Sequence, residues 1–179
     1  MKFLELANKR GSVRSYSDKK VEEEKIQRCL EAARLTPSAC NSQPWEFIVV
    51  SESEKRAGLA GFTGLALSKL NSWTHQAPVL VVVVAKKPNL SAGLGAAVKN
   101  RPYWLMDVGM AAEHFCLQAA EDGLGTCMLG WFNEKGVKKL LSLKRTDKVV
   151  LLITLGYPAR DVVKIKKRKS LDEMSRIEG

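Results

Sequence analysis

Residues 78–85 are the most restrictive stretch of the sequence, because all eight are apolar: Pro-Val-Leu-Val-Val-Val-Val-Ala. A strand with one face in water alternates apolar and polar side chains, whereas a strand that is apolar throughout is covered on both faces. The run is also much shorter than the roughly 20 residues that a helix needs to cross a bilayer. We therefore expect a central strand of a sheet, with other elements packed on each side.

Apolar periodicity predicts the remaining elements. Four residues at helical spacing predict a helix that ends before Pro37, namely Ile26, Cys29, Leu30 and Ala33. Helices are expected over 2–9, 22–35, 53–70, 107–122 and 134–143, strands over 45–50, 126–131 and 149–156, and a short helix start at 170–174. Residues 86–104 contain Pro88, Gly93, Gly95, Asn100 and Pro102, which favour a loop.

The expected helix over 107–122 is apolar on two faces. One stripe contains Val108, Ala111, Ala112, Phe115 and Ala119, while Met110 and Leu117 lie off it. A helix of this kind either occupies the middle of a domain or forms a subunit interface.

Residues 36–50 predict a polar loop that leads directly into a buried strand. Ser38, Asn41, Ser42 and Gln43 lie between Pro37 and Pro44, and an apolar run from Trp45 to Val50 follows. Such a loop at the mouth of a strand suits a planar ligand that is rich in heteroatoms. The residues alone leave open whether this is a ligand site or an ordinary polar turn.

A basic segment follows the first predicted helix. Arg10, Ser12 and Arg14 alternate, so an extended backbone would point all three side chains toward one ligand. Guanidinium and hydroxyl groups are suitable partners for a phosphate ester. Basic residues after a helix are also commonly solvated, or cap its carboxyl end, and both interpretations remain open here.

The chain carries 29 Lys and Arg against 19 Asp and Glu, a formal net charge of +10. This excess is compatible with nucleic acid, with a phosphorylated cofactor, or with solubility alone. No helix-turn-helix, zinc-finger or RNP-like pattern is present, so nucleic acid is the weaker interpretation. Only two histidines occur, and neither has a nearby second ligand, so we expect no metal site.

The four cysteines, Cys29, Cys40, Cys116 and Cys127, show no C-x-x-C spacing and are expected to be free thiols. The first residues are too short and too charged for a signal peptide. We therefore expect one globular domain over residues 1–179, in the reducing cytoplasm, with no membrane segment.

Three stretches together resemble the nitroreductase family of FMN-dependent oxidoreductases. They are R-G-S-V-R at 10–14, P-S-A-C-N-S-Q-P-W at 37–45, and G-L-G-T-C-M-L-G at 123–130. The resemblance runs from Arg10 to about Leu171 and is weakest from Lys55 to Trp104. Gly11 replaces a second basic residue that the family often has.

The resemblance implies which residues hold FMN. Arg10 and Ser12 would contact its phosphate, joined by Lys166 and Arg168 of the basic carboxyl-terminal region. Arg14 would lie near the pyrimidine end of the ring, at N1 and C2=O. The full cofactor-binding set that we expect is Arg10, Gly11, Ser12, Arg14, Pro37, Ser38, Ala39, Asn41, Met128, Leu129, Gly130, Lys166 and Arg168.

The fold implied by the resemblance is α+β, a three-layer sandwich in which helices flank a mostly antiparallel sheet of four strands. The family forms homodimers with FMN at the interface, through the apolar helix over 107–122, where small residues such as Ala111 and Ala112 would permit close approach. An arm over about 160–179, where Val163 and Ile165 alternate with bases, would cross to the partner as a fifth strand. The residues alone also allow a disordered tail.

The activity implied is transfer of hydride from NADH or NADPH through FMN to an electron-poor acceptor such as a nitroaromatic, a quinone or a flavin. The flavin carries this chemistry, so we expect no catalytic nucleophile among the cysteines. Alternatives are dehalogenation, azoline oxidation, flavin cleavage, and a flavin carrier or sensor with little turnover. Trp73, Tyr103 and Trp104 either border a substrate cavity or are ordinary core or interface aromatics. The choice between NADH and NADPH stays open.

Overall fold

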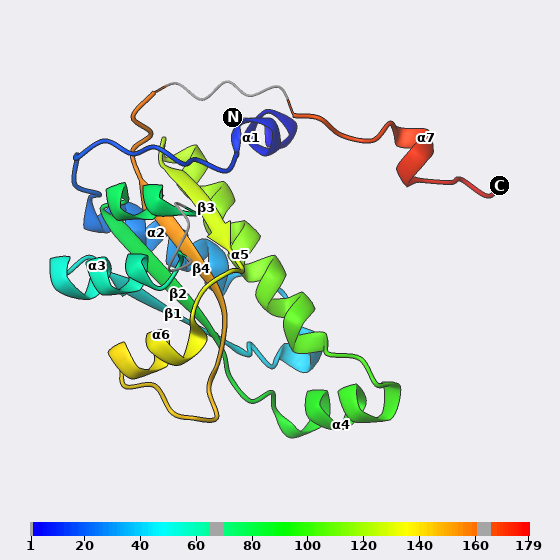
Figure 1. Cartoon of the computed structure of the whole chain (residues 1–179). Coiled ribbons are helices and arrows are strands. Elements are labelled where there is room, and N and C mark those ends of the chain that lie inside the picture. The colour runs from blue at the N-terminus through cyan, green and yellow to red at the C-terminus, as the bar shows by residue number, and fades with distance from the viewer. Residues whose placement is uncertain (1, 65–69, 161–165) are drawn as a thin grey trace.

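The computed structural model describes residues 2–64, 70–160 and 166–179, and its centre is a four-stranded antiparallel sheet (Figure 1). The spatial order is β1 (Trp45–Val50), β2 (Val79–Ala85), β4 (Lys148–Gly156) and β3 (Gly125–Leu129). Each neighbouring pair is antiparallel. The predicted α+β class and sheet are therefore confirmed.

Strand β2 lies inside the sheet and all seven of its residues are buried, as its continuous apolar sequence predicts. Its side chains alternate between two cores. Val81 and Val83 belong to one apolar cluster, while Val82 and Val84 belong to the other. The requirement for cover on both faces follows directly from this alternation.

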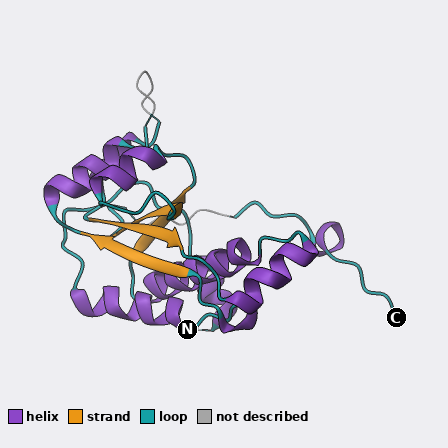
Figure 2. Ribbon diagram, turned by 90° about the horizontal axis from the view of Figure 1, so that it is seen from below, coloured by secondary structure: helices purple, strands orange, loops and turns teal. Residues whose placement is uncertain are grey.

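Helices supply that cover and make the three layers seen in Figure 2. On one face, α2 (Glu23–Arg34) and α5 (Tyr103–Glu121) contribute Cys29, Ala33 and Phe115 to the core. On the other face, α3 (Ser53–Gly61) and α6 (Glu134–Leu140) contribute Leu59 and Val137.

Shorter elements complete the chain. They are α1 (Phe3–Lys9), the 3₁₀ turns η1 (Ala39–Asn41) and η2 (Ser72–Gln76), α4 (Leu90–Lys99) and α7 (Leu171–Met174). Figure 1 shows α7 and the carboxyl terminus extending away from the sheet and its helices. In the described part of the chain, no helix is both long and apolar enough to cross a membrane.

The prediction of a loop over 86–104 was wrong. The segment contains α4, and α5 begins at Tyr103 rather than Asp107. Asn89 begins α4, because its side-chain oxygen accepts a hydrogen bond of 2.9 Å from the backbone nitrogen of Ala92. This cap offsets part of the cost of the two glycines inside the helix, each of which costs about 1 kcal/mol relative to alanine.

The helix predicted over 53–70 was too long. Helix α3 ends at Gly61, and turn residues follow through Gly64. Residues 65–69 lie outside the described part of the chain, as do Val163 and Ile165, on which the strand pattern of the arm was based.

The role expected for Ala111 and Ala112 was also wrong, because both are fully buried in the chain's own core beside Cys29 and Ala33 of α2. Small residues on both helices let α2 and α5 pack closely. The exposed apolar residues of α5 are instead Leu105, Met106 and Met110.

Candidate functional site

The basic segment that begins at Arg10 lies along β3, the edge strand of the sheet. Ser12 forms a parallel bridge with Thr126, and the backbone nitrogen of Val13 donates 2.9 Å to the carbonyl oxygen of Thr126. Val13 is buried, whereas Ser12 and Arg14 are exposed. The predicted alternation is present, and it leaves the hydroxyl and the guanidinium group available on the outer side.

Close contact between this segment and β3 depends on Gly125. A β-carbon at Gly125 would lie only 2.6 Å from a methyl carbon of Val13, well inside the van der Waals limit. Glycine is therefore required at this position for the segment to occupy the strand edge.

Three cationic side chains from opposite ends of the chain meet beside this segment. The Nε and Nη2 atoms of Arg10 each lie 2.9 Å from Oε1 of Glu113 on α5. Lys166 donates a hydrogen bond to the carbonyl oxygen of Ala7 in α1. Burial, followed by the positive charges of Arg10 and Arg168, lowers the pKa of Lys166. Positive charges grouped in this way favour a bound anion.

The sequence predicts that the arm carrying Lys166 and Arg168 crosses to a second subunit. In this chain, Lys166 lies close enough to Arg10 and to Arg168 of the same chain to interact with each electrostatically. The structure thus places Lys166 within electrostatic range of two other expected phosphate ligands, Arg10 and Arg168, in one chain. Ser12, the fourth, follows Arg10 on the same segment.

Arg14 lies over an aromatic ring. Its guanidinium carbon is 6.0 Å from the centroid of Trp73, and the Trp73 ring is 6.4 Å from that of Tyr16. Trp73 also packs against both the Val13–Tyr16–Ala77 cluster and the core on the α3 side. Trp73 is therefore a core aromatic whose ring also meets Arg14.

The expected ring-binding backbone lies farther along β3. Met128 and Leu129 end the strand, and Gly130 follows it, with open space where a β-carbon would project. Because the bridge to Ser12 is parallel, Arg14 lies toward Met128 and Arg10 toward Leu124. Gly130 is four residues after Thr126, about 13 Å along an extended backbone. The groups expected to bind the phosphate and those expected to bind the ring are thus ordered along one edge.

Trp104 and Gly130 both line a cavity of about 270 Å³ at this end of β3. Trp104 also packs against the core on the α5 side. Its partners in the cavity wall are Leu105, Phe132, Glu134, Lys148, Val149 and Val150. Tyr103, by contrast, begins α5 and is half-buried.

The polar loop predicted to bind the ring adopts a strained but well-anchored conformation. Cys40, Asn41 and Gln43 have left-handed φ angles of 50°, 51° and 45°. Within the loop, Ser38 Oγ accepts 2.9 Å from the backbone nitrogen of Gln43, and Asn41 Oδ1 accepts 3.1 Å from Gln43 Nε2. These bonds hold the side chains of Ser38 and Asn41 in place.

Helix α5 anchors this loop from outside. The buried carboxylate of Asp107 accepts from the backbone nitrogen of Ala39 at 3.3 Å, which places Ala39 and the preceding Pro37–Ser38 pair at the start of the helix. Thr36 Oγ1 lies 3.0 Å from Nδ1 of His114. The loop is therefore attached to α5 at two points.

The loop and the cationic group nevertheless contact α5 at different places. Asp107 holds the loop and Glu113 holds Arg10, and these positions are six residues apart in the helix. That spacing is about 9 Å along the axis and about 120° around it. The loop that contains Pro37, Ser38, Ala39 and Asn41 is therefore attached to a different side of α5 from Arg10, one of the residues expected to hold phosphate.

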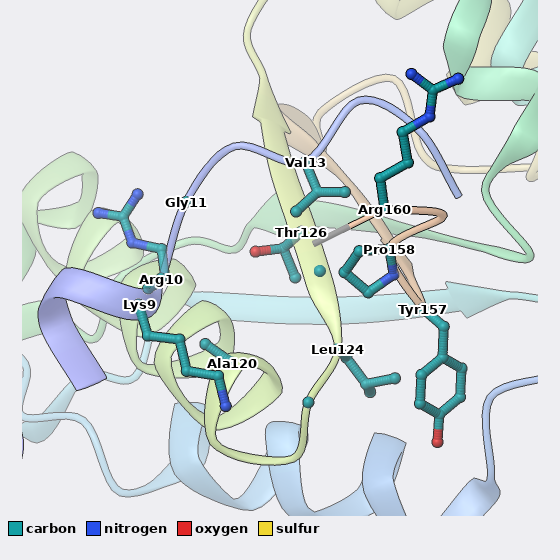
Figure 3. Close-up of a pocket in the computed structure, with 12 residues that line it drawn as sticks. Lys9, Arg10, Gly11, Val13, Ala120, Leu124, Thr126, Tyr157, Pro158 and Arg160 are labelled. Atoms are coloured by element: carbon teal, nitrogen blue, oxygen red, sulfur yellow. The ribbon is translucent and has the colours of Figure 1, made fainter. Parts of the chain in front are cut away.

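A larger cavity of about 530 Å³ lies at the Arg10 end of β3 (Figure 3). In Figure 3, Val13, Leu124 and Pro158 surround it, and the charged ends of Arg10 and Arg160 point away from it. Its full lining is Lys9, Arg10, Gly11, Val13, Ala120, Gly123, Leu124, Gly125, Thr126, Tyr157, Pro158 and Arg160. Both apolar and polar groups therefore line the cavity.

All four cysteines are free, as expected, and three of them are buried. Burial raises the pKa of Cys29 and of Cys116 to about 12 and also raises that of Cys127, so these thiols stay protonated near neutral pH. Among the described residues, no cluster of three or more His, Cys, Asp or Glu is arranged to hold a metal ion.

Sequence reasoning missed three residues that hold the site together: Asn89, Asp107 and Glu113. Asn89 carries a recognisable signal, a polar cap directly after Pro88 and before an apolar helix. Asp107 and Glu113 carry none, because their partners Ala39 and Arg10 are 68 and 103 residues away.

Comparison with known proteins identifies relatives along most of the chain. The model of the nitroreductase family matches residues 7–71 and 63–157. A protein of Archaeoglobus fulgidus, provisionally named an NADH dehydrogenase/NAD(P)H nitroreductase, is 33% identical over 163 residues, covering 87% of this chain and 84% of the relative. Iodotyrosine deiodinase 1 of Mus musculus is 29% identical, covering 96% of this chain and 68% of that protein.

Solved structures show the same fold. A nitroreductase family protein from Clostridium novyi NT superposes with a TM-score of 0.79 at 30% identity, covering 88% of this chain and 87% of the other. An FMN-dependent nitroreductase from Clostridium difficile R20291 superposes with a TM-score of 0.77 at 26% identity, covering 99% of each chain.

Proposed function

The chain belongs to the nitroreductase family of NAD(P)H-dependent flavin oxidoreductases, and we propose that it uses FMN to pass hydride from NADH or NADPH to an electron-poor acceptor. Nitroaromatics, quinones and flavins are the acceptor classes proposed. The observation that carries this proposal is the cluster of Arg10, Lys166 and Arg168 beside the edge strand β3.

The residues present fit the phosphate of FMN. Lys166 is a partly desolvated cation repelled by Arg10 and Arg168, so a bound dianion would relieve that repulsion. Arginine and lysine can donate charge-assisted hydrogen bonds to phosphate oxygens, and the exposed Ser12 hydroxyl can add another. We propose that these four residues hold the phosphate, next to the backbone of Gly11.

The ring would extend from there along β3. Arg14 and the backbone of Met128, Leu129 and Gly130 lie on the same edge, in the direction that an elongated cofactor would follow. The open space at Gly130 is compatible with close approach of a flat ring.

We propose that Pro37, Ser38, Ala39 and Asn41 complete the ring site from a second copy of the chain. Within one chain, this loop contacts α5 about 9 Å along the axis from Glu113. Met106 and Met110 are both exposed; Met106 directly precedes Asp107 in α5, and Met110 lies between Asp107 and Glu113. That apolar strip is a suitable dimer surface, since exposed apolar groups gain free energy when a partner covers them.

When bound, FMN supplies the two-electron chemistry that the side chains of the protein cannot supply. Arg14 would place a positive charge beside N1 and C2=O, where reduction adds negative charge. Ser38 and Asn41, held by their bonds to Gln43, would orient the ring. Trp104, in the cavity wall beside Gly130, would limit access of water and acceptor to that end.

Reductive dehalogenation is a second candidate, favoured by the match between iodotyrosine deiodinase 1 and 96% of this chain. Both candidates need the same cofactor and the same phosphate site. We further propose that residues 1–179 act as one domain in the cytoplasm, where a reducing environment would keep the four cysteines free.

The test is a visible absorption spectrum of the protein purified without added flavin, compared with the Arg10→Ala/Arg168→Ala double variant. The proposal expects about one FMN per subunit, bleached by NADH or NADPH, and its loss in the double variant. Flavin that stays oxidised with both nucleotides would instead indicate a carrier or sensor. A colourless protein that fails to take up FMN would refute the proposed function.

A further inference from the structure

The contact between Arg10 and Glu113 joins the basic segment to α5. Both Nε and Nη2 of the guanidinium group lie 2.9 Å from the same carboxylate oxygen, Oε1. The side chains are 28% and 35% exposed, so the pair is half-buried and only partly screened by water. This pair fixes the direction in which the guanidinium group points.

The charge balance around the pair is unusual. Arg10, Lys166 and Arg168 together carry three positive charges. The negative charge of Glu113 also acts on Lys166. The group therefore retains two positive charges. A phosphate monoester carries nearly two negative charges near pH 7, so the group with Glu113 ionised matches such a ligand in charge.

We propose that Glu113 is a positioning residue of the phosphate site, which orients Arg10 before the cofactor binds and keeps phosphate affinity below its maximum. This inference depends on the proposed function, because it assigns the regulation of affinity at the same site. Glu113 contacts the guanidinium group and not the flavin, so its effect passes through Arg10 and through its own charge.

Two physical effects of the carboxylate oppose each other. Without a bound anion, Glu113 offsets the repulsion among the three cations and so stabilises the empty site. With a phosphate bound, the same carboxylate is a like charge only one side chain away and weakens binding. Glutamine at position 113 keeps an oxygen that accepts a hydrogen bond from Arg10 but removes the negative charge. The substitution therefore tests the effect of the charge while the orientation of Arg10 is kept.

The experiment compares Glu113→Gln with wild type and with Glu46→Gln, after removal of bound flavin. Glu46 also forms a short ion pair, with Lys86 at 2.6 Å, but it lies on β1, the edge of the sheet opposite β3. Both variants change the net charge of the protein equally. Dissociation constants for FMN and for riboflavin, which lacks the phosphate, are measured by flavin fluorescence at low and high ionic strength.

We expect Glu113→Gln to bind FMN roughly tenfold more tightly at low ionic strength and riboflavin with unchanged affinity. The gain should shrink in high salt, because the added interaction is electrostatic. The melting temperature of flavin-free Glu113→Gln should be lower than that of flavin-free wild type. Wild type saturated with FMN should have a higher melting temperature than either flavin-free protein. Glu46→Gln should match wild type for both flavins.

FMN affinity that is unchanged or weaker in Glu113→Gln would overturn the inference. Equal loss for FMN and riboflavin would indicate a purely structural role for the residue. An equal gain in Glu46→Gln would indicate an effect of net charge alone, which also refutes it. Failure of wild type to bind FMN would refute the proposed function itself, and that result is visible before any variant is compared.

Discussion

Asn89 Nδ2 donates a hydrogen bond of 3.0 Å to the carbonyl oxygen of Cys40, a residue with a left-handed φ of 50°. The backbone nitrogen of Asn89 also donates 2.8 Å to Ser42 Oγ, while its side-chain oxygen caps α4. One asparagine thus joins the start of α4 to the loop that carries Ser38 and Asn41. The position of this helix and the shape of the loop are therefore coupled.

Asn89→Ala should lower both stability and flavin affinity. Loss of the helix cap costs about 1 kcal/mol, and loss of the side-chain bond to the Cys40 carbonyl oxygen adds a similar amount, while the backbone bond to Ser42 is kept. The loop would also be freer to leave its left-handed conformation, so FMN should dissociate faster. Urea unfolding and FMN titration measure the two effects.

Asn133→Ala is the matched control, because Asn133 caps α6 by accepting 3.1 Å from the backbone nitrogen of Gly136. It should lose about 1 kcal/mol of stability with unchanged FMN affinity. Equal loss of FMN affinity in both variants would show that Asn89 acts through stability alone.

Gly125→Ala should displace the basic segment from β3. The new methyl group would lie 2.6 Å from a Val13 methyl carbon, and relief requires movement of the backbone between Gly11 and Val13. We expect a loss of about 1–3 kcal/mol of stability, as for other overpacked sites, together with weaker FMN binding. Gly61→Ala, where the added β-carbon meets no atom within 4 Å, should leave FMN affinity unchanged and raise stability by at most about 1 kcal/mol, because Gly61 is the last residue of α3.

The hydroxyl of Tyr157 donates a hydrogen bond of 2.6 Å to Glu22 and, with nearby Lys19 and Lys25, lowers the pKa of that carboxyl from 4.5 to about 2. Because the folded-state pKa is lower than the unfolded one, the contribution to stability is present above about pH 4.5. It is lost as the pH falls from there through about 2.

Tyr157→Phe and Glu22→Gln should each flatten the pH dependence of stability in that window. The double variant should match Glu22→Gln, which removes the titrating carboxyl, while Tyr157→Phe should keep the part of the pH dependence that is due to Lys19 and Lys25. Urea midpoints measured from acid to neutral pH provide the comparison. A slope in the single variants as steep as that of wild type would contradict the assignment.

Met110→Asp should dissociate the proposed dimer. Met110 is 39% exposed on α5, between the helical positions that hold the loop and Arg10. A carboxylate there would have to lose its water when the partner covers it, which is costly. Sedimentation at several concentrations should show monomers, and FMN should be lost with them. Met110→Leu, which keeps the apolar surface, should remain dimeric with FMN bound, and a monomeric wild type would refute the dimer.

Local sequence patterns determined much of the fold. The continuous apolar run around Val82 requires cover on both faces, because side chains alternate across a strand. Helical spacing in the same way identified α2 and the body of α5. Helix α4 was missed because its glycines and flanking prolines outweigh its weak apolar pattern, while the cap that supports it, Asn89, was not recognised.

The alternation of Arg10, Ser12 and Arg14 predicted that the polar side chains share one side of an extended segment. Burial of Val13 with exposure of Ser12 and Arg14 agrees with that pattern. The roles assigned to these residues toward FMN remain predictions. Those roles were assigned from the spacing of Arg10, Ser12 and Arg14 and from the similarity to the family, both of which come from the sequence alone.

Only the tertiary structure decided which distant groups meet. Arg10 pairs with Glu113, Ala39 with Asp107, and Lys166 lies beside Arg10, across separations of up to about nine-tenths of the chain. Such pairings depend on how α5 packs against the sheet and how the basic segment follows β3, and neither leaves a local pattern. The sequence therefore determined the strands, most helices and the candidate ligands, while packing determined which charges face one another.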